Sequence, residues 1–230
     1  MKNLTKVALL LLVASIGLMA PSVSVASNPT KEQLKERQAI KKMTKAELNE
    51  KASKDARKEA KELKKQGWKA TPGSLPIERQ LDRCYLMQME YDDDFNPKYI
   101  MGEGMSVGEV YDAAKMQAIE LAKQQIISKI ESEMASIITN DVSNKQMTSE
   151  QAASIAESVN KSKTIIKQKL NRVLTVMEVY RTLGNGNKEV LVRIAYNAGS
   201  ATDIAKKAIK EDQKAKGEAL TDELNALLSE

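Results

Sequence analysis

The residues best suited to chemistry in this chain are a group of acidic side chains near its middle. Four oxygen-bearing side chains have the spacing of ligands 1, 3, 5 and 12 of a calcium-binding EF-hand loop: Asp92, Asp94, Asn96 and Glu103. That loop requires glycine at its sixth position and a helix after it. This chain has Pro97 at the sixth position, and residues 98–105 have the pattern of a strand. We therefore interpret the acidic stretch as a solvated turn and expect no metal ligands.

Three glycines at the end of the same predicted strand suggest a second chemistry. Gly102, Gly104 and Gly108 precede a predicted helix, as the glycines of a phosphate-binding turn do. Their spacing is one residue longer than the dinucleotide-binding pattern, and no βαβ unit follows. We interpret them as glycines for a strand bulge and a tight turn into the helix.

The remaining residue types narrow the chemistry further. The chain has no histidine, the commonest general base and zinc ligand, and a single cysteine, Cys84. Cys84 lies in an apolar helical pattern without a neighbouring base, which predicts a buried small hydrophobic side chain. The sequence thus predicts no catalytic residue, no cofactor-binding residue and no cofactor. An enzyme using Asp92–Asp94 and Glu103 is the alternative, and it requires a cleft in which two acids meet with perturbed pKa values.

The composition limits how these residues can be positioned. Among 230 residues, 42% are apolar and 29% charged, but only 3% are aromatic. The core must therefore consist of Ile, Leu, Val, Met and Ala, which favours helices packed on a small sheet. The formal net charge is +5, and it falls to +3 without Lys2 and Lys6. So small a charge does not indicate a nucleic-acid partner.

The first 26 residues have the pattern of a signal peptide. Lys2 and Lys6 precede an apolar stretch over 7–20, and Ser24-Val25-Ala26 forms a small-x-small cleavage site. We expect an exported protein that begins near Ser27 and has no transmembrane segment after cleavage. No cysteine lies near this site, so no acyl anchor is expected. The alternative is a retained membrane anchor.

Residues 27–67 are predicted to form a lysine-rich helical arm. Thr44 and Glu47 have capping-box spacing and open a helix over 45–66. Its apolar stripe is narrow and mostly alanine: Leu48, Ala52, Ala56, Ala60 and Leu63. Such a stripe buries little area, so we expect the domain to fold without the arm. The charged face is then solvated, or the stripe binds a partner.

The only tryptophan follows this helix directly. If the helix ends at Gln66, Gly67 takes the left-handed conformation, and Trp68 meets Leu63 in a Schellman motif. We therefore expect Trp68 to have a structural role, fixing the end of the arm to the next domain. Stacking of a ligand on Trp68 is the alternative.

Residues 68–198 are predicted to form an α+β domain. Helical periodicity covers 76–91, and a capping box of Ser106 and Glu109 predicts a long helix to about Thr139. Thr148 and Gln151 predict a further helix to about Asn171, with these residues facing inward: Ala152, Ala156, Val159, Ile166 and Leu170. Residues 199–230 are predicted to be a helical tail, from Ser200 to about Lys216 and from Leu220 to Leu228.

A hairpin is the clearest local pattern. Two strands, 173–183 and 188–196, flank Asn185-Gly186, the preferred centre of a two-residue turn. The resulting register places Val179 opposite Val192 and Met177 opposite Ile194 on the core side. It places Glu178 opposite Arg193 on the solvent side. With the strand 98–105, the hairpin is predicted to form a small three-stranded antiparallel sheet packed on long helices.

Three segments resemble a known family. GWKATPGSLPIERQL, YIMGEGMSVG and EVYRTLGNGNKEVLVRIAYN are similar to segments of the Bacteroidetes-type branch of the Lpp-twenty lipoprotein family, over about 68–198. The resemblance implies an α+β envelope domain, related to the N-terminal domain of a flagellar ring protein, with no established enzymatic activity and no catalytic residues. This chain lacks the lipidation cysteine of that family.

The sequence predicts an exported, non-catalytic protein that binds an envelope protein or an envelope surface. The alternatives are a secreted or vesicle-borne effector and the carboxylate-dependent enzyme described above.

Overall fold

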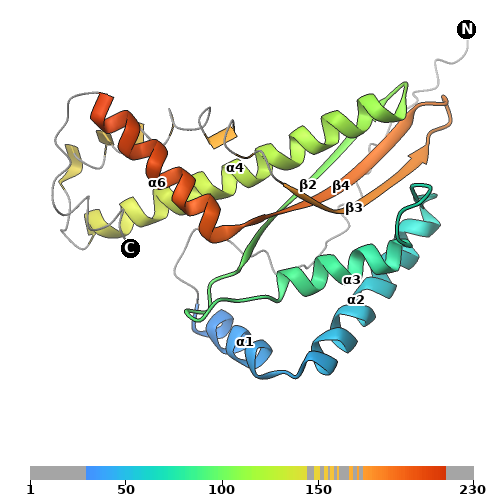
Figure 1. Cartoon of the computed structure of the whole chain (residues 1–230), viewed down its shortest axis with the longest axis horizontal. Helices are drawn as coiled ribbons and strands as arrows, with labels where there is room; N and C mark the ends of the chain where they lie inside the picture. Colours follow the sequence, from blue (N-terminus) through green and yellow to red (C-terminus); the bar gives the residue numbers. More distant parts are fainter. Residues whose placement is uncertain are drawn as a thin grey trace, which may run out of the picture.

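The computed structural model describes residues 30–143, 148–150, 153–154, 156–157, 160, 166–167, 170 and 173–215. Its elements, in chain order, are α1 (Lys31–Lys42), α2 (Lys45–Lys65), β1 (Lys69–Ala70), α3 (Ile77–Gln88), β2 (Tyr99–Gly108), α4 (Tyr111–Ser143), β3 (Leu174–Thr182), β4 (Lys188–Asn197) and α6 (Ala198–Ala215). Figure 1 shows the strands running between two groups of helices. No described helix combines the length and the apolar character that crossing a bilayer requires.

The α+β class is confirmed, but the sheet has four strands, not three. Its order is β1-β3-β4-β2, and every neighbouring pair is antiparallel. The additional strand, β1, directly follows Trp68 and pairs with β3 through Lys69 and Ala70 only. Two residues are too few to show a strand periodicity, so the sequence pattern missed it.

The hairpin forms where predicted, but its register is shifted by one residue. The Leu183 N–H donates to the Asn187 carbonyl, and the Gly186 N–H donates to the Leu183 carbonyl. Gly186 has φ 87°, so the loop is a three-residue turn ending in a left-handed glycine. Val179 therefore lies opposite Leu191, and Glu178 lies opposite Val192, contrary to the predicted pairs. The same one-residue shift places Met177 opposite Arg193, not Ile194, and a further irregularity between Thr175 and Met177 changes the pairing of Thr175 and Leu174.

The sheet is covered on both faces along β4, so the solvent face predicted for Arg193 does not exist. On one side, Val190, Val192 and Ile194 pack against α4 and α6. On the other side, Leu191 and Ala195 pack against α2 and α3 (Figure 1). Successive β4 residues alternate between these two cores, which is why every residue from 189 to 195 is buried. Arg193 is one of these buried residues.

The glycines of β2 allow α4 to lie directly on the strand. A Cβ added at Gly102 would be 2.2 Å from the Ala122 carbonyl oxygen, and one at Gly104 would be 2.0 Å from that of Ala118. The predicted bulge and turn are therefore wrong, because β2 continues to Gly108 and its glycines accommodate the helix backbone. The predicted capping box is also wrong, since Ser106 lies within β2 and α4 begins at Tyr111.

The arm is part of the fold. Its predicted Schellman motif is confirmed, because the Trp68 N–H donates to the Leu63 carbonyl at 3.1 Å and Gly67 has φ 84°. The alanine stripe of α2 is buried against α3 and the sheet, within the same core cluster as Trp68. We therefore revise the expectation that the arm is dispensable, because its removal would uncover Trp68 and the buried face of α3 and would leave Arg193 without Glu59.

The C-terminal helices agree with the sequence only in part. The helix α6 begins at Ala198, before the predicted Ser200, and the Asn197 side chain accepts the Ser200 N–H. Ile166 and Leu170 are buried as predicted, whereas Ala156 is exposed. The predictions for Gln151, Ala152 and Val159, for the helix 220–228 and for the signal peptide of residues 1–26 lie outside the described residues.

Candidate functional site

The acidic stretch that imitates a calcium loop forms a closed turn. The Asp92 carboxylate accepts the backbone N–H groups of Asp94 and Asn96 at 3.0 and 2.8 Å. From α1, Lys41 donates to the Asp92 carbonyl and Arg37 donates to the Phe95 carbonyl. Residues of the arm therefore stabilise this turn by binding its backbone carbonyl groups. Among the residues described, no group of three or more metal-ligating side chains occurs.

Glu103 belongs to a different site, formed around Arg193 of β4. The Arg193 guanidinium contacts Glu103 at 2.6 Å and Glu59 of α2 at 2.6 and 3.2 Å. The side chains of Arg193 and Glu59 are only 7% and 10% exposed. The Tyr85 hydroxyl donates to Glu59 at 2.8 Å, and burial, together with this bond, raises the pKa of Tyr85. Two carboxylates thus converge, but they converge on a guanidinium that forms an ion pair with each of them.

Cys84 of α3 lies beside the Arg193 site. The thiol is buried in the same core, and burial raises its pKa to about 12. At neutral pH it is protonated and unsuited to nucleophilic attack. The sequence pattern did not identify Glu59 as part of a site. Its position next to Ala60, in the buried stripe of α2, was a signal that it needs a charged partner. A charged side chain next to the buried face of a helix requires a partner on the element it packs against.

A second acid, Glu133 of α4, is partly buried without such a partner. Its Oε2 oxygen is buried and has no hydrogen-bond partner among the described residues. Burial raises the pKa of Glu133 to about 7, and the charge of Lys206 on α6 only partly opposes this shift. We therefore treat Glu133 as a determinant of stability.

We expect Glu133 to make the protein less stable as the pH rises. Between pH 4.5 and about 7 the folded state holds a proton at Glu133 that the unfolded state releases, so the free energy of unfolding falls with rising pH. Glu133→Gln should raise the melting temperature at pH 8 and change it little at pH 4.5. A thermal melt series of both proteins from pH 4.5 to 8 tests this. Equal effects at both pH values would contradict it.

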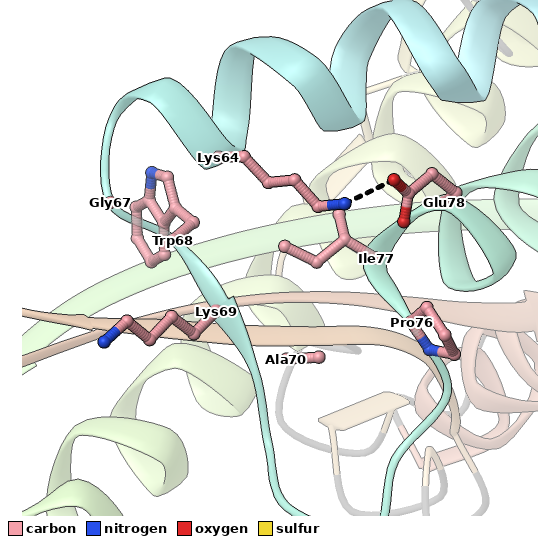
Figure 2. Close-up of a pocket in the computed structure, with 8 residues that line it drawn as sticks. All are labelled: Lys64, Gly67, Trp68, Lys69, Ala70, Pro76, Ile77 and Glu78. Atoms are coloured by element: carbon pink, nitrogen blue, oxygen red, sulfur yellow. Dashed lines mark hydrogen bonds and ion pairs between the residues drawn. The ribbon is translucent and has the colours of Figure 1, made fainter.

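The described surface also contains a recess where the arm joins the domain. It has a volume of about 370 Å³ and is lined by the end of α2, by β1 and by the start of α3: Lys64, Gly67, Trp68, Lys69, Ala70, Pro76, Ile77 and Glu78. Figure 2 shows Trp68, Ile77, Ala70 and Pro76 around the hollow, with the Lys64–Glu78 ion pair across one side. Apolar walls with lysines at the rim suit a ligand with an apolar body and an anionic group.

Trp68 is a fixed wall of this recess. The Arg181 guanidinium lies over its ring at 4.7 Å, and the indole N–H donates to Gln66 at 3.3 Å. With only 4% of its surface exposed, Trp68 fills the structural role predicted for it. Lys69 is exposed at the rim and has no ion pair among the described residues. Of the two lysines in this lining, Lys69 is therefore the one whose charge is not used in an ion pair among the described residues, and its ammonium group extends away from Ile77 and Pro76 in Figure 2.

No protein-family model, curated protein or solved structure matches this chain.

Proposed function

We propose that this is an exported, non-catalytic protein of the cell envelope that binds an envelope component at the Trp68 recess. The recess is the observation that carries the proposal. It combines an apolar lining with the unpaired cation of Lys69, and it lies on a surface that Trp68 and the Schellman motif hold rigid. Export rests on the signal-peptide pattern of residues 1–26.

The partners of the acidic side chains in the domain favour binding over catalysis. Glu103 and Glu59 are bound by Arg193, and the Asp92 carboxylate accepts two backbone N–H groups. A general acid or base needs a carboxyl that is free to reach a substrate. Each of these three carboxylates is instead bound by groups of the protein itself. The resemblance to the Lpp-twenty family supports the same envelope role and stays part of the proposal.

Export is tested by the mass and location of the protein made in its own cells. We expect an intact mass that corresponds to a start near Ser27 with no lipid adduct, and recovery with the periplasm or the outer membrane. The same mass with recovery in vesicles or the medium would favour the effector. A retained N-terminus or an acyl adduct would overturn this part of the proposal.

A further inference from the structure

The outer edge of β2 is partly closed by α4. The Lys129 side chain donates to the Met101 carbonyl at 2.7 Å, and the Gln125 side-chain oxygen accepts the Glu103 N–H at 2.6 Å. Backbone groups of alternate residues along an edge strand point the same way. The N–H and C=O groups of Met105 and Val107 therefore point outward as well, and among the described residues they have no hydrogen-bond partner.

The exposed side chains of this open stretch are apolar, and the charges around it balance. The side chains of Met105 and Val107 are 52% and 44% exposed on the sheet face opposite α4. On the α4 side, Gln117, Leu121, Gln125 and Lys129 follow one another at four-residue spacing, and Leu121 is exposed beside the open residues. Of the charged residues near the open stretch, Glu103 pairs with Arg193 and Glu189 pairs with Arg181. Glu109 and Lys188, at its Gly108 end, carry opposite charges.

Exposed edges are normally protected by charged side chains, prolines or covering elements. Here α4 protects the edge as far as Glu103 and leaves two residues open. We propose that Met105 and Val107 bind a short, uncharged, extended segment of a partner protein, which pairs with β2 as an additional strand. Alternate side chains of that segment would pack on Met105 and Val107 and on Leu121. This surface is separate from the Trp68 recess and does not depend on it.

A second copy of this chain does not fit the same edge. Because α4 passes close over Gly102, Gly104 and Gly108, it follows β2 along its length. Antiparallel pairing of two β2 edges would place the two α4 helices over strands about 4.8 Å apart. Packed helices need about 8–10 Å between their axes. A single extended segment has no such helix, which favours it as the occupant.

The test uses the peptide acetyl-Thr-Val-Thr-Val-Thr-Val-Thr-amide as the probe and amide hydrogen exchange, followed by NMR, as the readout. We expect the peptide to slow exchange at Met105 and Val107 by about tenfold or more. Exchange at Glu103, whose N–H is already bonded, should stay unchanged. Unchanged exchange at Met105 and Val107 would overturn the proposal. So would protection that grows with protein concentration alone, which would indicate a second copy.

Val107→Pro removes one outward N–H, a change that edge strands tolerate. We expect it to weaken peptide binding by about tenfold with little change in melting temperature, whereas Val107→Thr should bind nearly as the native protein does. Met105→Lys is a second variant that leaves the backbone intact, and it should also weaken binding. Leu75→Lys, at an exposed apolar residue elsewhere, is the matched control. Equal binding by all four variants would contradict strand addition.

Discussion

Arg193→Met is expected to lower the free energy of unfolding by about 3–5 kcal/mol, because it leaves a buried carboxylate without its cation. Glu59 is 10% exposed and receives two contacts from Arg193, so water cannot replace the lost partner. Urea denaturation of the native protein and the variant measures the difference.

Two further variants separate the buried pair from the exposed one. Glu103 is 43% exposed, so Glu103→Gln should cost less than about 1 kcal/mol. Combining Arg193→Met with Glu59→Met should restore much of the stability lost by Arg193→Met alone, since no charge then remains buried. If Arg193→Met costs no more than Glu103→Gln, the ion pair does not hold α2 on the sheet.

Gly104→Ala is expected to destabilise the protein by about 3 kcal/mol through overpacking. The new Cβ would lie 2.0 Å from the Ala118 carbonyl oxygen and 2.6 Å from the Ala122 nitrogen, both backbone atoms of α4. Neither can move without shifting the helix. Urea denaturation should therefore show a lower midpoint for the variant.

Gly184→Ala is the matched control for this substitution. Gly184 lies in the hairpin loop with no heavy atom near its added Cβ, and its φ is not in the left-handed region. Its replacement should change stability by about 0.5 kcal/mol or less. Similar losses from both variants would show that close packing of α4 on β2 is not the cause.

Local chemistry allowed much of the fold to be predicted. The Schellman motif at Gly67, the helix α3 and both hairpin strands depend on neighbouring residues, and all are present as predicted. The hairpin register failed because Asn185-Gly186 suits either a two-residue turn or a three-residue loop that ends at Gly186. Core packing on both faces of β4 decides between them, and a turn pattern does not contain that information.

Long-range contacts explain the other errors. Glu59 and Arg193 are 134 residues apart in the chain, so no spacing links them. The alanine stripe of α2 suggested a weakly buried arm. In the structure, small side chains let α2 lie close to α3, and the stripe forms part of the core. The glycines of β2 were interpreted as a turn because their role also depends on packing. They leave room for the backbone of α4, and the spacing of the glycines alone does not reveal that contact.

The proposed function depends most on the Trp68 recess, and reversing the charge at its rim tests it most directly. Lys69→Glu changes an exposed side chain, so the fold should be kept. Lys54→Glu, on the exposed face of α2 away from the recess, makes the same charge change as a control. The measurement is the amount of each protein that co-sediments with purified envelopes, with melting temperatures recorded in parallel.

We predict that Lys69→Glu lowers association by about tenfold while its melting temperature and the association of Lys54→Glu stay close to those of the native protein. Association of Lys69→Glu equal to that of the native protein would contradict binding at the recess.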